Sequence, residues 1–506
     1  FLLSRTPHPP PTPPASLVTT MRSRLSLRCC TRRRLARLVS SSSFTVDNPY
    51  TGAVHAEVAL TNAAAAASIV GAASAAQRAF YYETTLDERI ALCDRLIDAF
   101  ESMQDEVAAD ISGSMGKPVH HALGEVGGMF ERVRGMRDLA TAALADEVLP
   151  EKPGFDRRIV KEPVGVVFVI APWNYPLLTA VNSIVPAVLA GNAVVLKHSP
   201  RTPGVADAFV RAFAAAGAPD GLVAALHCDH DVTDSVISDE RVGFVSFTGS
   251  VGGGRAVAQS AARTRFINTT LELGGKDPTF VAADCDLAYA VESVVEGATW
   301  NAGQSCCGIE RAYVHRSIYD EFVERAAAQF EASLAIGDPT SAATSLGPMA
   351  LPAAPAFMEA QVAEAVSKGA RIASGTGRAV VDPASGTGRF FSPTLVADCT
   401  HDMEIMKVET FGPVLGVTPV ESDEEALALM NDSEFGLTAS IFTSDQDRVA
   451  RMAPLLECGT VFQNRCDYLD PELAWTGVKN TGSGVSLSKF GFGGVTQLKN
   501  YHLKTL

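Results

Sequence analysis

Residues 164–197 read VGVVFVIAPWNYPLLTAVNSIVPAVLAGNAVVLK. The runs at 164–170 and 193–197 are short and almost wholly apolar, which is typical of strands buried on both faces of a parallel sheet. Between them, residues 177–189 have the composition of a helix, and Gly191 follows at a position that favours its end. A strand, a helix and a second strand of this kind predict a parallel β-α-β unit.

The same alternation continues along the chain. Further strands and helices follow up to a helix that begins near residue 250, and a second series runs from 278–281 to about residue 459. The predicted fold class is therefore α/β, with two Rossmann-like, doubly wound parallel-sheet domains. Residues 143–163 lack helical periodicity, which predicts an extended hairpin arm. The tail from residue 485 is rich in glycine and then extended, as if it added a strand to another subunit.

Composition excludes several classes of protein. The chain has 506 residues, enough for two or more hydrophobic cores, and 47% of them are hydrophobic. Its net charge of −15 is a poor match for nucleic-acid phosphates, so no nucleic-acid partner is expected. No apolar run reaches the roughly 18 residues of a membrane-spanning helix, so no membrane partner is expected either.

The ten cysteines show no paired C-x-x-C spacing, which favours free thiols in a reducing compartment. The segment His227-Cys228-Asp229-His230 is dense in metal-ligand types. Adjacent residues of one short segment rarely converge on one ion, however, so we interpret it as a loop and expect no metal site.

The N-terminal segment differs from the rest of the chain. Residues 1–46 contain eight arginines and no Asp or Glu, and the segment from Met21 is also rich in serine. This composition predicts an organelle transit peptide, with a mitochondrial matrix address as the first choice and a chloroplast address as the alternative. Cleavage near Ser43 would then leave a mature protein that starts at Phe44.

A candidate nucleophile lies in residues 301–307, NAGQSCC, directly after a helical pattern at 287–300. The thiolate is the reactive form of cysteine, so a catalytic cysteine needs a site that lowers its pKa or removes its proton. The alternative is a thiol that only packs in the core. By itself the stretch does not distinguish Cys306 from Cys307.

Four further segments have the chemistry that such a cysteine needs, although each alone is compatible with a structural role. Asn174 follows the first strand, where its amide could donate to an oxyanion. Glu272 lies between two leucines, and apolar surroundings raise a carboxyl pKa, which suits a general base. Residues 247–250, FTGS, open a helix whose free N–H groups suit a pyrophosphate, and residues 409–413, ETFGP, offer a carboxylate and a ring to a nucleoside.

Together these segments resemble the aldehyde dehydrogenase family over residues 44–506. The matching residues are Pro172-Trp173-Asn174, Lys197, Phe247-Thr248-Gly249-Ser250, Leu271-Glu272-Leu273-Gly274-Gly275-Lys276, Gly303-Gln304-Ser305-Cys306, Glu409-Thr410-Phe411-Gly412-Pro413 and Asn464. The spacing of 34 residues from Glu272 to Cys306 is also similar to the family's. That register selects Cys306 over Cys307.

The resemblance implies a role for each matching residue. Cys306 would be the nucleophile, Asn174 and the Cys306 backbone N–H would stabilise the oxyanion, and Glu272 would activate the water that hydrolyses a thioester. The implied cofactor is NAD, with NADP as the alternative, and the implied assembly is a homodimer or homotetramer. The residues implied to bind the cofactor are Trp173, Lys197, Ser199, Gly249, Ser250, Glu409 and Phe411.

The departures from the family concern cofactor and substrate. Pro200 stands where many NAD-preferring members have a glutamate that accepts from the adenosine ribose. The pattern at 197–200 and 431–436 is similar to the bacterial succinate-semialdehyde branch, which commonly has an arginine where this chain has Asn182. Arg465 could compensate, although a solvated arginine is the simpler interpretation. The expected substrate pocket consists of Tyr175, Leu178, Asn182, Arg465 and Trp475. Without the branch's arginine, this pocket would suit a neutral or aromatic aldehyde at least as well as a semialdehyde.

The resemblance also implies a division of the chain. The expected parts are a leader at 1–43, a cofactor-binding domain at 44–142 and 164–275, a catalytic domain at 276–459 and an oligomerisation arm at 143–163 and 485–506. Residues 460–484 are expected to form the substrate-entrance loop and the return to the cofactor-binding domain. The alternatives to a hydrolytic aldehyde dehydrogenase are a semialdehyde-specific enzyme, a CoA-acylating relative, a catalytically silent structural member and a cysteine hydrolase. Retention of Glu272, Cys306 and Asn174 argues against the acylating and silent members, and no histidine is nominated as the base of a hydrolase.

Overall fold

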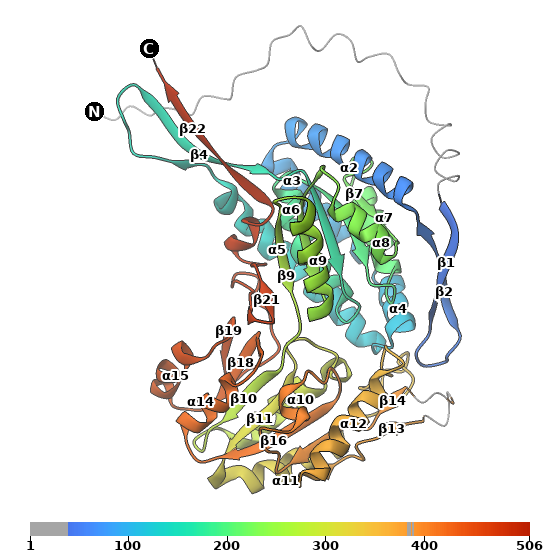
Figure 1. Ribbon diagram of the computed structural model, residues 1–506, viewed down its shortest axis with the longest axis vertical. Helices are drawn as coiled ribbons and strands as arrows, with labels where there is room; N and C mark the ends of the chain where they lie inside the picture. Colours follow the sequence, from blue (N-terminus) through green and yellow to red (C-terminus); the bar gives the residue numbers. More distant parts are fainter. Residues whose placement is uncertain (1–38, 382–385, 387–388, 506) are drawn as a thin grey trace.

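The computed structural model describes residues 39–381, 386 and 389–505. Most of the predicted leader, residues 1–38, lies outside the described residues. Two α/β bodies and a projecting arm make up the molecule (Figure 1). No helix within the described ranges is long and apolar enough to cross a membrane.

The first sheet has the strand order β21-β9-β8-β5-β6-β7, and only its edge strand β21 is antiparallel to its neighbour. Its strands are β5 (Val166–Ala171), β6 (Ala193–His198), β7 (Val223–Ala225), β8 (Val242–Thr248), β9 (Asn268–Glu272) and β21 (Gly482–Ser483). Every residue of β5 and β6 is buried, which explains their continuous apolar sequence. The chain leaves β5 toward β6 and β7, then returns to β8 on the other side, so the strand order reverses at β5.

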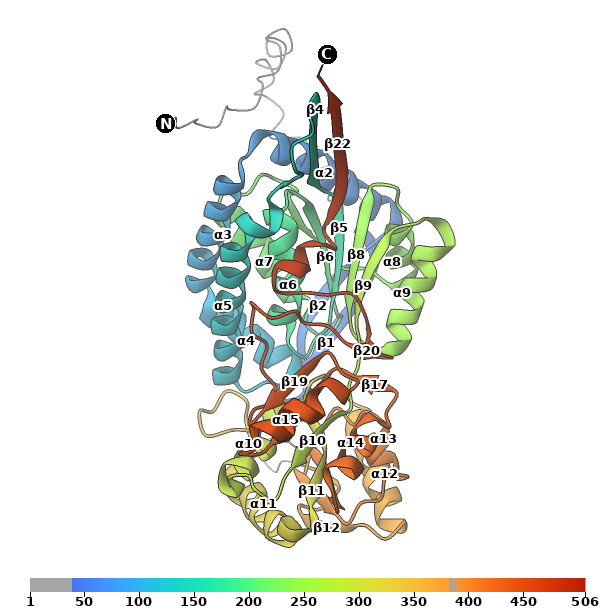
Figure 2. The ribbon, with the colours of Figure 1, turned by 90° about the vertical axis from the view of Figure 1, so that its left-hand side faces the viewer.

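Helices cover both faces of this sheet (Figure 2). One group of mutually packed helices consists of α3 (Leu86–Glu101), α4 (Gln104–Met115), α5 (Val119–Leu144), α6 (Pro176–Leu189) and α7 (Gly204–Ala215). The other consists of α2 (Ala63–Glu83), α8 (His230–Ile237) and α9 (Val251–Thr264). A capping box of Thr85 and Glu88 begins α3, where the Thr85 N–H donates to the Glu88 carboxylate at 2.7 Å.

The second sheet has the order β12-β15-β16-β11-β10-β18-β19, with only β12 antiparallel to its neighbour. Its strands are β10 (Asp277–Val281), β11 (Ile309–His315), β12 (Arg371–Ser374), β15 (Thr394–Ala397), β16 (Val414–Val420), β18 (Thr438–Phe442) and β19 (Thr460–Gln463). Its helices are α10 (Leu287–Thr299), α11 (Tyr319–Ser333), α12 (Ala354–Ser367), α13 (Glu404–Lys407), α14 (Asp423–Asn431) and α15 (Gln446–Met452). Separate hydrophobic clusters fill its two faces, so the predicted α/β fold class is confirmed by both sheets.

A three-stranded antiparallel sheet of order β22-β4-β3 projects from the first body (Figure 1). It consists of β3 (Glu147–Val148), β4 (Phe155–Pro163) and β22 (Thr496–Lys504). The two segments predicted to be extended thus pair with each other within one chain, in a register that joins Thr496 to Pro163. The remaining strands are β1 (Val39–Asp47), β2 (Val54–Thr61), β13 (Ala379–Val380), β14 (Phe390–Phe391), β17 (Phe435–Gly436) and β20 (Val478–Lys479).

Candidate active site

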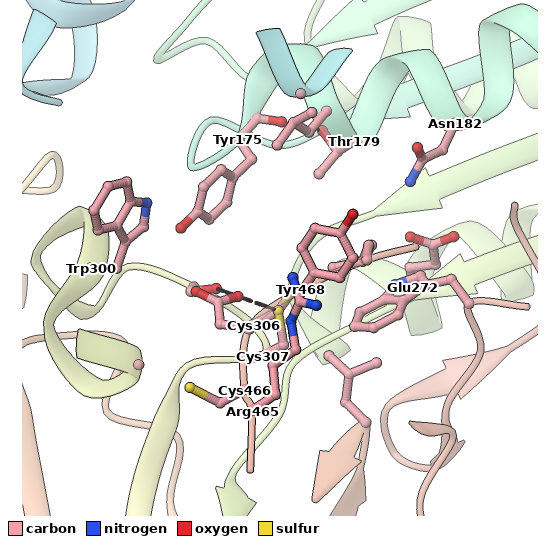
Figure 3. Close-up of a pocket in the computed structure, with 18 of the residues that line it drawn as sticks. Tyr175, Thr179, Asn182, Glu272, Trp300, Cys306, Cys307, Arg465, Cys466 and Tyr468 are labelled. Carbon is pink, nitrogen blue, oxygen red and sulfur yellow. Dashed lines mark hydrogen bonds between the residues drawn. The ribbon is translucent and has the colours of Figure 1, made fainter. Parts of the chain in front are cut away.

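A cavity of about 570 Å³ lies where the first body, the loop after α10 and the segment after β19 meet (Figure 3). Its walls come from α5, α6, the end of β9, the loop that contains Cys306, and residues 465–469. All five residues predicted for the substrate pocket line this cavity: Tyr175, Leu178, Asn182, Arg465 and Trp475. Tyr175 and Asn182 extend toward it from the start and the second turn of α6.

The loop before Cys306 is a left-handed turn. Asn301, Ala302 and Gly303 have φ values of 53°, 55° and 68° in succession. Such conformations cost free energy for residues other than glycine, so the surrounding structure must hold them. At Gly303 a Cβ atom would lie 2.2 Å from the carbonyl oxygen of Gly412, which leaves no room for any side chain.

Side-chain amides complete the support of this turn. Asn301 Nδ2 donates to the carbonyl oxygens of Asn174 and Gln304, each at 3.1 Å. Gln304 Oε1 accepts from the Ala350 N–H at 2.9 Å. The turn is therefore fixed to both bodies, which holds the following cysteine in one place.

The two adjacent cysteines have different surroundings. Cys306 is partly exposed and lines the cavity. Cys307 is 4% exposed, and its Sγ donates to Asp467 Oδ1 at 2.9 Å. A hydrogen bond with Cys306, burial and the Asp467 charge raise the pKa of the Cys307 thiol well above its usual value. This asymmetry favours Cys306 as the nucleophile, because Cys307 is held as a neutral thiol.

Asn174 is buried beside the nucleophile loop without lining the cavity itself. Its Nδ2 donates to the Gln304 carbonyl oxygen at 3.2 Å, two residues before Cys306. The sequence places it there because β5 ends at Ala171 and α6 begins at Pro176, so residues 172–175 form the turn at the carboxyl edge of the sheet.

Glu272 is the last residue of β9 and lines the cavity. Burial raises its pKa above the usual value of a glutamate, while the Ser486 hydroxyl and the positive charge of Arg132 oppose that shift. A carboxylate with a raised pKa takes up a proton more readily near neutral pH, which is the property that a general base needs.

The cofactor residues predicted from the sequence gather at the carboxyl edge of the first sheet. Trp173 follows β5, Lys197 lies near the end of β6, and Gly249 and Ser250 follow β8. Because the strand order reverses at β5, this is the edge at which open α/β sheets bind ligands. Ser250 begins α9 and accepts from the Gly253 N–H at 3.2 Å, so the helix presents its N-terminus to this edge.

Lys197 shows that this edge fits an oxygen-rich ligand such as a dinucleotide. Its side chain is buried at 6% exposure, and within the described ranges the ammonium group has neither an ion pair nor a hydrogen bond. Burial lowers the pKa of its ammonium group. A buried cation without an anion is costly, and hydroxyl or phosphate oxygens of a ligand would remove that cost. Ser199, two residues later, accepts from the Arg201 N–H at 3.2 Å.

Glu409 and Phe411 approach the same region from the second body. Glu409 Oε1 accepts from the Gly275 N–H at 2.9 Å, and burial together with the charge of Glu310 raises its pKa to about 7. Phe411 has a left-handed backbone, with φ at 53°, and its ring packs edge-on against Trp173 at 5.5 Å between centroids.

Sequence reasoning missed three charged or phenolic residues of the cavity. Arg132, on α5, is 8% exposed, and its Nη1 donates to Asn182 Oδ1 at 3.2 Å. Asp467 accepts from Cys307, and the Tyr468 hydroxyl donates to Glu131 Oε1 at 2.7 Å. For Arg132 a signal was present, because an arginine interrupts the apolar face of α5. Nothing in the sequence pointed to Asp467 and Tyr468, because their part in the cavity depends on where the 465–469 loop lies in the fold.

Comparisons with known proteins identify the family and the fold. A model of the aldehyde dehydrogenase family matches residues 38–501. Succinate semialdehyde dehydrogenase [NAD(P)+] Sad of Escherichia coli K12 is 37% identical over 81% of this chain and 87% of its own. The 3,6-anhydro-alpha-L-galactose dehydrogenase of Streptomyces coelicolor is 35% identical over 88% of this chain and 90% of its own. The structure of succinic semialdehyde dehydrogenase from Streptococcus pyogenes in complex with NADP+ has a TM-score of 0.86 at 31% identity, covering 91% of this chain and 100% of its own.

The relatives overturn one prediction. The mitochondrial location, with the chloroplast as its alternative, is wrong, because these similar proteins come from bacteria, which have neither organelle. Composition alone misled here: an Arg-rich, Ser-rich segment without acidic residues is not unique to transit peptides. Of residues 21–44, whose composition motivated the prediction, residues 21–38 lie outside the described residues and residues 39–44 belong to strand β1.

Proposed function

This chain belongs to the aldehyde dehydrogenase family and oxidises aldehydes to carboxylic acids with NAD(P), and we propose that it does so through a thioester on Cys306. Glu272 activates the water that hydrolyses this thioester. The observation that carries the proposal is the meeting of Cys306 and Glu272 at one cavity, with Asn174 tied to the loop that holds the cysteine.

In the first half of the reaction the Cys306 thiolate adds to the aldehyde carbon, and the carbonyl oxygen becomes an oxyanion. The Cys306 backbone N–H and the Asn174 amide are the proposed donors to that oxygen. The nicotinamide cofactor, when bound, supplies the acceptor for the hydride that leaves the same carbon. Loss of the hydride leaves an acyl group in thioester linkage to Cys306 Sγ.

In the second half Glu272 takes a proton from water, and the water oxygen bonds to the acyl carbon. The bond between that carbon and Cys306 Sγ then breaks, which releases the carboxylic acid and restores the thiolate. The raised pKa of Glu272 supports this role. The position of Glu272 on the cavity also disfavours the CoA-acylating alternative, in which no water needs activation.

For the cofactor, we retain NAD as the first choice and NADP as the alternative. Lys197 and Glu409 would hold ribose hydroxyls, and Phe411 would pack near the nicotinamide ribose. Trp173 and Ser250 would contact the pyrophosphate region, with Gly249 and Ser199 also at the cofactor. Pro200 brings no carboxylate to this edge that would repel a 2′-phosphate. The cofactor-binding domain would thus comprise 44–142 and 164–275, and the catalytic domain 276–459.

A homodimer or homotetramer is the proposed assembly. Strand β22 is the edge of the arm, with its outer N–H and C=O groups unpaired within the described chain. Leu498 and Leu503 of β22 are 69% and 48% exposed. Exposed edges of this kind pair with another strand or are otherwise covered, so the arm of a second subunit is the proposed partner. Light scattering after gel filtration would test it.

The proposed chemistry is tested with an aldehyde panel, read as reduced cofactor at 340 nm with NAD+ and NADP+ and as carboxylic acid without CoA. We expect Cys306→Ala to abolish oxidation and Cys307→Ala to keep most of it, because the latter thiol faces Asp467. A dead Cys307→Ala beside an active Cys306→Ala would refute the assignment of the nucleophile.

A further inference from the structure

Arg132 is a buried cation on the wall of the cavity. It lies on the face of α5 that also buries Val126, Met129, Val133 and Met136. One of its nitrogens, Nη1, donates to the Leu178 carbonyl oxygen at 2.7 Å and to Asn182 Oδ1 at 3.2 Å. Both acceptors are neutral, so they orient the guanidinium without balancing its charge.

The carboxylates around Arg132 are already occupied. Glu125 forms a buried ion pair with Lys117 and also accepts from the first turn of α6. Glu131 accepts from Tyr468, and Glu272 is the proposed base. Within the described ranges Arg132 has no ion pair of its own, and its Nε and Nη2 have no hydrogen-bond acceptor.

The fourth nearby acid, Asp467, is also committed to a partner. It accepts from Cys307 at 2.9 Å, and burial raises its pKa. Burial lowers the pKa of Arg132, yet a guanidinium stays charged in proteins. Glu125, Glu131 and Glu272 act on this charge without forming an ion pair with it in the described residues. Its unused donors belong to a side chain that lines the cavity, where a ligand carboxylate could pair with them.

We propose that Arg132, oriented by Asn182, binds the carboxylate at the far end of an aldehyde substrate and thereby sets substrate preference. The inference rests on the proposed function, because it assumes that the aldehyde carbon lies at Cys306 in the same cavity. The sequence suggested that Asn182 leaves this point of the pocket without a cation. In the structure, Asn182 instead holds the guanidinium of Arg132, which comes from another helix.

A carboxylate fits better than a phosphate. The planar fork of a guanidinium pairs with two oxygens of one carboxylate. The other cation on the cavity wall, Arg465, is exposed and stacked on the Tyr468 ring at 3.6 Å. Glu131 and Glu296 also line the cavity. One buried cation among acidic residues suits a monoanion and repels a dianion.

The test compares 4-oxobutanoate with butanal, two aldehydes of equal length, by the ratio of their kcat/KM values with the full chain and NAD+. Wild type is expected to prefer 4-oxobutanoate. Arg132→Gln should lower the ratio about 100-fold, mainly through KM for 4-oxobutanoate, because a buried charge pair loses one partner. A fall in the rates of both aldehydes together, with a shifted acid limb of the pH profile, would instead assign Arg132 to positioning Glu272 and overturn the proposal.

Asn182→Asp is the matched variant if Arg132→Gln fails to fold. It keeps Arg132 but supplies an internal carboxylate that competes for the guanidinium, so the same ratio should fall. Arg465→Gln is the control and should change the ratio less. Three outcomes would each overturn the inference: an unchanged ratio in Asn182→Asp, equal use of both aldehydes by wild type, or a preference of wild type for glyceraldehyde 3-phosphate. Failure of wild type to oxidise any aldehyde would instead refute the proposed function.

Discussion

Glu409 links the cofactor edge to the pH dependence of stability. Its carboxylate is buried beside Gly275 and near Glu310, which raises its pKa from 4.5 to about 7. Between those two values the folded protein keeps a proton that the unfolded chain releases. Stability is therefore highest below the unfolded pKa, falls as the pH rises, and has lost the full contribution above about pH 7.

The size of the effect follows from the shift. Each pKa unit corresponds to about 1.4 kcal/mol, so moving the pKa from 4.5 to about 7 lowers the unfolding free energy by about 3 kcal/mol in all, most of it between about pH 5 and pH 8.5. Glu409→Gln keeps an oxygen that can accept from the Gly275 N–H but cannot ionise. Wild type and variant should therefore be alike at about pH 5, and the variant should be more stable at about pH 8.5.

Urea unfolding followed by tryptophan fluorescence measures this difference. The two proteins should show equal m-values, and the gap between their midpoints should open only as the pH rises. Taking the difference between wild type and variant removes the contributions of all other titrating groups. A gap that does not change with pH, or a variant that becomes the less stable protein at high pH, would refute the burial of an ionisable Glu409.

Three further predictions concern the reaction. Glu272→Gln should give a burst of about one reduced cofactor per site and then stall, because hydrolysis lacks its base; a normal steady state would remove Glu272 from that role. Gly303→Ala should inactivate the enzyme and slow alkylation of Cys306 by iodoacetamide, because its Cβ would meet the Gly412 oxygen at 2.2 Å; wild-type alkylation would contradict this. Lys197→Met should weaken NAD+ binding about tenfold or more without loss of stability, because an unpaired buried ammonium is removed; calorimetry and urea unfolding measure the two effects.

Local sequence signals were sufficient for much of the fold. Strands buried on both faces are continuous apolar runs, so the predicted strand at 193–197 agrees closely with β6 at Ala193–His198. The pairing of β21 with β9 had no local signal, since Gly482–Ser483 is two residues long and joins a strand about 200 residues earlier. The same holds for the arm, where β22 pairs with β4 of its own chain.

The residues of the site show the same difference between local sequence signals and tertiary contacts. Cys306, Glu272 and Asn174 were nominated by motifs, because their chemistry depends on fixed neighbours in the sequence. Arg132 and Asp467 were not, since their contacts are made across α6 and the 465–469 loop and depend on tertiary packing. The pattern that would have drawn attention to Arg132 is a charged residue on the apolar face of a helix.

The left-handed turn at 301–303 has a consequence for synthesis of the protein. The parts that hold it come from Asn174, upstream, and from Ala350 and Gly412, which are translated later. A nascent chain that has left the ribosome only as far as Cys306 therefore carries that thiol on an unsupported loop. Domains form as units during translation. Cys306 is therefore positioned for catalysis only after residues past 412 have packed. The growing polypeptide does not carry a preorganised nucleophile before that point.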